Sequence, residues 1–231
     1  MIKFENVSVT YPGGVEALKD LNLEIKDGDF IIIVGLSGAG KSTLLRTVNN
    51  LVKPSNGSVY LEGKNVTSAK KKELKKIRSQ IGMIFQTFNL VNRSTVLKNV
   101  LTGRLSNIST IRSILGLWPK DQKEMAFEAL NQVEILEKAY VRASNLSGGQ
   151  QQRVGIARAL SQKPKVMLAD EPVASLDPIT SRVVMSYLKK INTELGITTI
   201  VNLHFLDLAK EFGDRLIGLR DGKLVFDGNV N

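Results

Sequence analysis

The sequence contains no cysteine and a single histidine. A chain without cysteine forms neither disulfide bonds nor thiolate metal sites, and this composition is compatible with a reducing compartment. One histidine also rules out a histidine-rich metal cluster. Proteins that depend on a disulfide framework or on a metal held by such ligands are therefore excluded.

Long apolar runs are missing too. The densest run, FIIIV at residues 30–34, is the size of a strand, whereas a membrane-spanning helix needs roughly 18 apolar residues. The chain opens with alternating residues (IKFENVSVTY) that predict a strand and not a signal peptide. No repeat, low-complexity tract or long Pro/Gly linker divides the 231 residues, of which 42% are hydrophobic. We expect one soluble, cytoplasmic domain with a substantial core.

Basic residues outnumber acidic residues by 32 to 22, which gives a formal net charge of +10. This excess is compatible with binding to nucleic acid, to an anionic membrane surface or to acidic partners. Much of it lies in one run, AKKKELKKIR at residues 69–78. Such runs are usually the solvated face of a helix, and we predict that here.

The first part of the chain has the pattern of strands separated by turns. Alternating or apolar segments lie at residues 2–11, 17–25, 29–35 and 58–63, and Asp27-Gly28 and Asn56-Gly57 lie between such strand-like segments. Asx-Gly dipeptides in such positions are typical of tight hairpin turns. The pattern therefore predicts two hairpins in an antiparallel β edge.

The rest of the chain combines helices and strands. Residues 87–145 are mostly helical in pattern, and Pro119 falls at a break between two helices. After residue 160, apolar strands alternate with helical segments. Continuous apolar strands between helices predict a mainly parallel sheet covered on both faces, in an α/β fold with a helical insertion.

Residues 35–42, GLSGAGKS, match the phosphate-loop pattern between an apolar strand and a helix. Glycines at positions 38 and 40 let backbone N–H groups turn toward a phosphate, and the following helix N-terminus adds partial positive charge. Lys41 would neutralise the β- and γ-phosphates, and the Ser42 hydroxyl would coordinate Mg²⁺. A plain glycine turn followed by Lys-Ser is the alternative.

Two adjacent acids, Asp170 and Glu171, follow the apolar run VMLA. A strand that ends in aspartate beside a phosphate loop brings a carboxylate close to Mg²⁺. The neighbouring glutamate is placed to polarise an attacking water as a general base. Adjacent acids at a strand end are unspecific alone, so this prediction depends on the phosphate loop upstream.

A second glycine-rich helix start lies in NLSGGQQQRVGIARAL, residues 145–160. Ser147 and Gln150 fit a capping box, which by itself explains both residues. It does not explain Gly148 and Gly149, since a glycine in a helix costs roughly 1 kcal/mol relative to alanine. An approaching phosphate would explain bare backbone at this position. The phosphate loop, however, already supplies a site for the chain's own nucleotide.

The order of these motifs resembles that of the ATP-binding-cassette ATPases over nearly the whole chain. The motifs are GLSGAGKS, Gln86 after IGMIF, LSGGQ, VMLADE, SLD at residues 175–177, and His204 after TTIVNL. The resemblance implies a P-loop NTPase core with a mainly parallel sheet and an antiparallel β subdomain (residues 1–86 and 146–231). A helical subdomain (residues 87–145) would be inserted between Gln86 and LSGGQ, within a single domain.

In this family, LSGGQ is similar to a signature loop that completes the ATP site of a second subunit. The resemblance thus implies that two copies of the chain meet head to tail and bury two ATP molecules between them. The second glycine-rich turn would then hold the partner's γ-phosphate, which accounts for a phosphate site that the chain itself does not need.

The resemblance also implies roles for single residues. Tyr11 would stack on adenine (a core aromatic is the alternative), and Gln86 would contact Mg²⁺ and the attacking water. Asp177 would bridge the two sites, although SLDP alone predicts a helix cap. His204 would sense the γ-phosphate beside Glu171, although a lone histidine is more often structural.

The implied site falls into three groups. The catalytic residues are Glu171, His204 and Gln86, and the Mg²⁺ ligands are Ser42, Gln86 and Asp170. The nucleotide-binding residues of the two copies are Tyr11, Gly35, Ser37, Gly38, Ala39, Gly40, Lys41, Ser42, Thr43, Ser147, Gly148, Gly149, Gln150 and Asp177.

Within the family, residues 88–105, 109–130, 169–178 and 201–228 resemble the ATP-binding subunit of phosphonate importers. Such a subunit would work at the cytoplasmic face of the membrane with transmembrane permease subunits, and indirectly with an extracytoplasmic solute-binding protein. Residues 86–105 and 115–130 would dock on a cytoplasmic loop of the permease.

Two other functions stay open at this point. The chain is also compatible with import of another solute, such as phosphate, an amino acid or a metal complex. A cassette ATPase that acts on ribosomes or nucleic acid would suit the +10 charge. Proteins of that kind usually carry two cassettes or a long coiled-coil insertion, and neither is visible here. We therefore expect no nucleic-acid partner.

Overall fold

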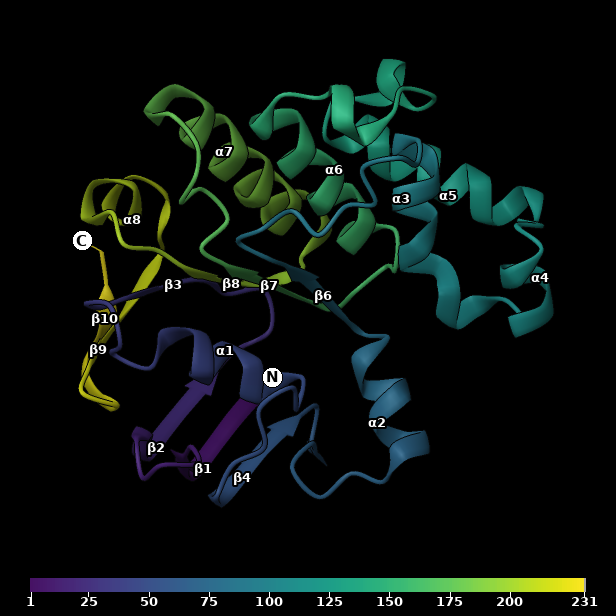
Figure 1. The fold of residues 1–231 in the computed structure, drawn as a ribbon. Coiled ribbons are helices and arrows are strands. Elements are labelled where there is room, and N and C mark those ends of the chain that lie inside the picture. The colour runs from purple at the N-terminus through teal and green to yellow at the C-terminus, as the bar shows by residue number, and fades with distance from the viewer. Residues whose placement is uncertain (231) are drawn as a thin grey trace.

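The central feature of the fold is a six-stranded, mainly parallel sheet (Figure 1), seen in a computed structural model that describes residues 1–230. The strand order is β10-β9-β3-β8-β7-β6, and every pair is parallel except β9 with β10. The strands are β3 (Phe30–Val34), β6 (Ile81–Ile84), β7 (Val166–Asp170), β8 (Thr198–Asn202), β9 (Arg215–Arg220) and β10 (Lys223–Asn229). The predicted mainly parallel sheet is confirmed.

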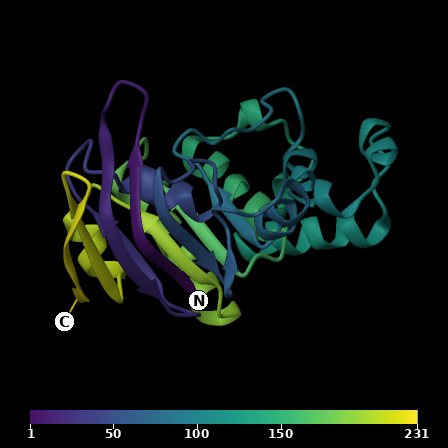
Figure 2. The same ribbon diagram turned by 90° about the horizontal axis from the view of Figure 1, so that it is seen from below.

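The N-terminal strands form a separate antiparallel sheet with the order β2-β1-β4-β5. It consists of β1 (Ile2–Thr10), β2 (Glu16–Ile25), β4 (Asn56–Leu61) and β5 (Lys64–Asn65). The predicted antiparallel subdomain is confirmed, as a second layer instead of an edge of the main sheet. Figure 2 shows the long β1–β2 hairpin extending beyond the rest of the molecule.

Both predicted Asx-Gly hairpins are wrong. Asp27-Gly28 does form a turn, but the strands on either side of it, β2 and β3, belong to different sheets. The fully apolar β3 is buried between two parallel neighbours, β8 and β9, so it leaves no edge for β2. Asn56-Gly57 lies within β4 itself, where it faces an irregularity in β1.

Helices cover the main sheet and fill the middle of the chain. The α-helices are α1 (Lys41–Val48), α2 (Lys71–Arg78), α3 (Val96–Leu101), α4 (Thr110–Ile114), α5 (Lys120–Gln132), α6 (Gly148–Leu160), α7 (Pro178–Leu195) and α8 (Leu206–Phe212). Short 3-10 helices span Thr102–Asn107, Leu136–Lys138 and Ala143–Asn145. The break predicted at Pro119 is confirmed, because this residue caps the start of α5. The basic run forms α2, which buries one residue, Ile77.

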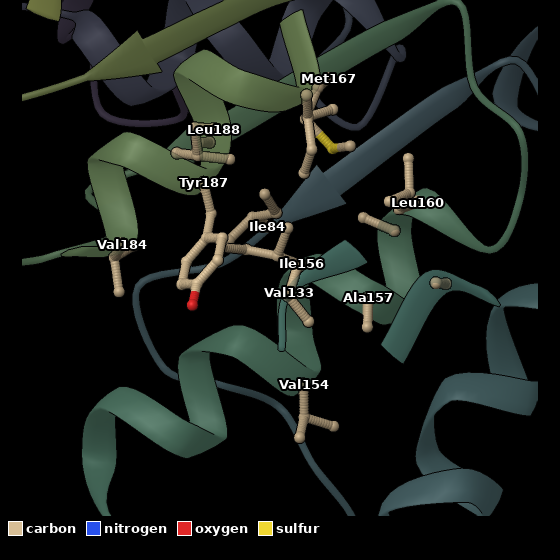
Figure 3. Close-up of a cluster of buried hydrophobic side chains, with 14 of the residues drawn as sticks. Ile84, Val133, Val154, Ile156, Ala157, Leu160, Met167, Val184, Tyr187 and Leu188 are labelled. Carbon is tan, nitrogen blue, oxygen red and sulfur yellow. The ribbon is translucent and has the colours of Figure 1, made fainter. Parts of the chain in front are cut away.

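The apolar strand β3 divides the core into two parts. Phe30 and Ile32 point into a cluster with α6 and α7, whereas Ile31 and Ile33 point into a cluster with α1 and the antiparallel sheet. This follows from the two-residue period of a strand whose faces are both covered. In the first cluster, α6, α7, β6 and β7 contribute interlocking side chains (Figure 3).

Gly57 is required by the irregularity between β1 and β4. Its φ is +77°, and a Cβ there would lie 2.2 Å from the carbonyl oxygen of Asn6. Gly63 has a similar φ of +73°, but a Cβ there would meet nothing within 4 Å. A comparison of substitutions at the two glycines therefore separates the cost of a positive φ from the cost of steric overlap.

We predict that Gly57→Ala destabilises the fold more than Gly63→Ala. The left-handed conformation alone costs about 1–2 kcal/mol for alanine, which applies to both variants. Overlap with the Asn6 carbonyl adds about 1–3 kcal/mol at Gly57, because backbone must move. Urea unfolding of the two variants measures the difference, and equal stabilities would contradict it.

Candidate functional site

The candidate site lies at one edge of the main sheet, where three neighbouring strands end. The phosphate loop follows β3, Asp170 ends β7, and Asn202 ends β8, which lies between them. These strands are parallel, so their carboxyl ends share one edge, the usual place for ligands in such sheets. Residues that are far apart in the sequence thereby meet around the start of α1.

The phosphate loop lines a cleft of about 360 Å³. The lining residues are Tyr11, Val15, Glu16, Ala17, Ser37, Gly38, Ala39, Gly40, Lys41, Ser42, Thr43, Glu171 and His204. Within the loop, Gly38 and Gly40 both have positive φ, as a tight anion-binding turn requires. Most of the predicted nucleotide-binding residues of the loop are thus gathered in one concavity.

Lys41 is held back against its own loop. Its Nζ donates to the carbonyl oxygens of Gly35 at 2.8 Å and Leu36 at 3.1 Å. Burial lowers the pKa of Lys41 below its usual value, and the carboxylates of Glu171 and Asp170 partly oppose this effect. An ammonium group with few waters around it is available to bind a phosphate without first losing a full hydration shell.

Asp170 is buried and has donors on both carboxylate oxygens. Ser42 Oγ donates at 2.7 Å and Asn202 Nδ2 at 3.0 Å to Oδ1, and Arg46 donates through Nε and Nη2 to Oδ2. Neither Arg46 nor Asn202 was found from the sequence. The signals were present: Arg46 lies one turn after Ser42 on the same helical face, and Asn202 ends the strand beside Asp170.

Glu171 and His204 form a pair above the phosphate loop. His204 Nε2 lies 2.5 Å from Glu171 Oε1, and His204 Nδ1 lies 3.4 Å from Lys41 Nζ. Glu171 has a left-handed backbone with φ of +53°. Such conformations cost about 1–3 kcal/mol in non-glycine residues and cluster at functional sites. The backbone geometry directs this carboxylate to the cleft.

The Ser42 hydroxyl at the start of α1 and the Asp170 carboxylate at the end of β7 suit a Mg²⁺ ion. Mg²⁺ prefers oxygen ligands and usually takes one or two carboxylates from the protein and the rest from phosphates and water. Ser42 and Asp170 supply oxygens of this kind side by side. Within residues 1–230, no group of three or more His, Cys, Asp or Glu side chains could hold a metal alone. The donor set therefore fits an ion that arrives with a phosphate ligand.

Tyr11 lies at the rim of the cleft. Its side chain is 39% exposed, so the alternative of a core aromatic is wrong. The Tyr11 hydroxyl is 3.2 Å from Thr43 Oγ1, which connects the rim to the first turn of α1. Gln86, by contrast, is exposed after β6 and is not among the residues that line the cleft.

The LSGGQ motif at residues 146–150, which we call the signature segment, forms the start of α6 and lies outside this cleft. Ser147 Oγ accepts from the Gln150 N–H, and the Gln150 side chain accepts from the Ser147 N–H, which confirms the predicted capping box. None of the residues from Ser147 to Gln150 lines the cleft of its own chain.

The two glycines of the signature segment have a partial explanation within the chain. A Cβ at Gly149 would lie 2.3 Å from Cγ2 of Thr180 in α7, and one at Gly148 would lie 3.2 Å from Leu176. An approaching phosphate is therefore not the only explanation for bare backbone at Gly149. Close packing of α6 against the start of α7 already requires a glycine there.

Asp177 caps α7, as SLDP predicts. Its Oδ1 accepts from the backbone N–H groups of Ile179 at 3.1 Å and Thr180 at 3.0 Å. Hydrogen bonds from the Thr180 side chain, and then from backbone N–H groups, lower the pKa of Asp177 below its usual value. The side chain is thereby fixed beside the signature segment.

The fold and the cleft together define an ATP-binding cassette. The family model for the ABC transporter matches residues 18–174, and the chain belongs to that family.

Relatives with curated names are similar over the whole chain. The Phosphonates import ATP-binding protein PhnC of Bacillus thuringiensis subsp. konkukian is 60% identical over 230 residues, which cover 100% of this chain and 90% of that relative. A protein of the same kind, PhnC 3 of Halalkalibacterium halodurans, is 58% identical over 99% of this chain and 88% of its own length.

The solved structures include a dimer of a related cassette. It is a post-hydrolysis state bound to ADP and Pi, with a TM-score of 0.87 and 39% identity over 100% of this chain and 99% of that one. The cassette fold predicted from the sequence is thereby confirmed.

The contact between Gly149 and Thr180 can be tested with a pair of substitutions. We predict that Gly149→Ala lowers the free energy of unfolding by about 1–2 kcal/mol, because the new methyl group overlaps Thr180 Cγ2. In Gly149→Ala/Thr180→Ser that methyl partner is gone, so stability should return to at least the wild-type value, since alanine is favoured over glycine in helices. Urea unfolding measures both, with Thr180→Ser as the control.

Proposed function

We propose that this chain is the ATP-hydrolysing subunit of an importer for phosphonates, which works through a transmembrane permease and pairs with a second copy of itself. The observation that carries the proposal is the Glu171–His204 pair above the phosphate loop of a cassette. The full-length similarity to phosphonate import proteins supports the substrate class.

In the proposed reaction, the oxygen of a water attacks the γ-phosphorus of ATP and the bond from that phosphorus to the β-phosphate oxygen breaks. Glu171 accepts the proton that the water loses, and His204 orients Glu171 and contacts the γ-phosphate. Lys41 leaves the carbonyls of Gly35 and Leu36 and binds the β- and γ-phosphates. Mg²⁺ bound to Ser42 and Asp170, with Gln86 as a further ligand, would neutralise phosphate charge.

The adenine would lie against Tyr11, which is exposed at the rim of the cleft. The partner copy would supply Ser147, Gly148, Gly149 and Gln150 to the γ-phosphate, because the helix start that they form carries partial positive charge. This arrangement is supported by the position of the signature segment outside its own chain's cleft and by the dimeric form of the related cassette. Asp177 would help to link the two sites.

None of the helices formed by residues 1–230 combines the length and apolar content needed to cross a bilayer. Transport would therefore require separate membrane subunits, and we propose that residues 86–105 and 115–130 contact a cytoplasmic loop of the permease. An extracytoplasmic solute-binding protein would deliver the phosphonate to the permease.

The role of Glu171 is tested by Glu171→Gln. This variant should bind ATP normally but hydrolyse it about 10²–10⁴-fold more slowly, because general-base assistance is lost. ATP should also trap it as a dimer in size-exclusion chromatography. Glu16→Gln is a matched control, since Glu16 lines the same cleft without contacting His204. Unchanged turnover of Glu171→Gln would remove this residue from the mechanism.

The substrate class is tested in proteoliposomes that hold the permease, this chain and the solute-binding protein. An alkylphosphonate should stimulate ATP turnover and enter the vesicles, whereas phosphate and amino acids should not. The same complex with Glu171→Gln is the control for transport without hydrolysis. Stimulation by phosphate or an amino acid, with no response to phosphonate, would assign the importer to another solute.

A further inference from the structure

An exposed apolar extension lies at the outer end of the helical subdomain. We refer to residues 105–118, which include α4, as the α4 projection. In Figure 1 α4 lies beyond α5 at the end of the molecule opposite β9 and β10, and Figure 2 shows it extending outward from the helices that cover the main sheet. No residue of α4 is buried, so this helix makes no contribution to the core.

Large apolar side chains dominate the surface of the α4 projection. Ile111 is 72% exposed, Ile114 79%, Leu115 64% and Leu117 58%. Isolated exposed apolar residues are normal on a protein surface, whereas a contiguous group of them marks an interaction site. Four such side chains within seven residues form a group of this kind, and no other part of residues 1–230 covers them.

The only charged residue within the α4 projection is Arg112, and the acidic residues Asp121 and Glu124 follow it in the first turns of α5. Residues 74–120 contain no aspartate or glutamate, although the whole chain has 22 acidic residues. Arg112, within α4, is exposed and makes no ion pair among the described residues. Lys120 pairs with Glu124 at 3.7 Å, but both side chains are exposed and such pairs contribute little. The projection therefore combines apolar side chains with one unpaired positive charge, that of Arg112, and no acidic residue.

We propose that the α4 projection inserts its apolar side chains into the interfacial region of an anionic lipid bilayer beside the permease. Short helices with exposed isoleucine and leucine next to basic residues bind this region, through apolar burial and attraction to anionic headgroups. Cytoplasmic loops of membrane proteins are themselves rich in Lys and Arg, so they are poor partners for an apolar surface that has an unpaired arginine and no acidic residue. Charge complementarity therefore favours lipid as the occupant of residues 105–118, and the proposed contact with the permease loop then falls to the rest of the two segments, residues 86–104 and 119–130.

This proposal goes beyond the proposed function, because it assigns a direct lipid contact to this chain that requires neither the permease nor a substrate. Trp118, the single tryptophan of the sequence, lies at the end of the projection and is half-buried. Its fluorescence therefore reports on this region without a label.

The test uses the full chain alone with vesicles of phosphatidylcholine, with or without phosphatidylglycerol. The chain should sediment with the anionic vesicles, less so at high salt. Spin-labelled lipids should quench Trp118 in the same samples. Failure of wild type to bind, or binding without quenching of Trp118, would overturn the proposal and leave the proposed ATPase function intact.

Three variants separate the contributions. Ile111→Ser/Ile114→Ser/Leu115→Ser should reduce partition to anionic vesicles by about tenfold or more, because apolar burial is lost. Arg112→Gln should reduce it by about fivefold, and only where phosphatidylglycerol is present. Leu51→Ser/Val225→Ser removes exposed apolar side chains elsewhere, 52% and 61% exposed, and should bind as wild type does.

The results distinguish lipid from protein as the partner. Equal binding by the triple variant and wild type would overturn the proposal. A second result would also overturn it: wild type does not bind pure lipid vesicles, and the triple variant fails to co-purify with the permease. The partner of the α4 projection would then be a protein. Thermal unfolding checks that the triple variant is folded, and Arg112→Gln provides an independent test if it is not.

Discussion

The structure of the site depends on the burial of one carboxylate. Asp170 is 3% exposed, and an unpaired ionised carboxylate in such surroundings would cost several kcal/mol. Its donors come from three separate segments: Ser42 and Arg46 on α1, and Asn202 at the end of β8. The need to satisfy this charge fixes how the phosphate loop, β7 and β8 must lie. The same packing that stabilises the fold thus aligns the groups that would bind Mg²⁺ and phosphate.

A second contact connects the signature segment to the sheet edge that carries the candidate site. Gly149 approaches Thr180 so closely that a side chain would not fit, and Thr180 donates its N–H to the capping Asp177. Asp177 follows Glu171 by six residues. The turn that would serve the partner's nucleotide is therefore packed against the segment that follows Glu171, the proposed general base. A shift of α6 relative to α7 would move both the signature segment and the segment after Glu171, because packed helices do not deform continuously.

Features that depend on spacing along the chain could be predicted from the sequence. Features that depend on tertiary pairing could not. GLSGAGKS and the acids after β7 are local patterns, and the structure brings Lys41 and Glu171 into one cleft. Asp27-Gly28 marks a turn, but nothing local says that the next strand joins another sheet. Arg46 was missed because no motif includes it, and its pairing with Asp170 becomes evident only when α1 packs beside β7. The role of Gly149 in helix packing likewise becomes evident only when α6 packs against the start of α7.

Acidic residues are distributed unevenly along the chain, between the candidate site and the helical subdomain. The acids that would serve catalysis, Asp170 and Glu171, lie at the sheet edge among donors that use their charge. Residues 74–120 lack acids altogether and lead through the helical subdomain to the α4 projection. Acidic groups there would weaken attraction to an anionic membrane surface, whereas basic groups near the phosphate site are needed only where they touch phosphate or Asp170. The absence of acids from residues 74–120 would thus suit a membrane contact of the proposed kind, and the +10 net charge does not by itself require a nucleic-acid partner.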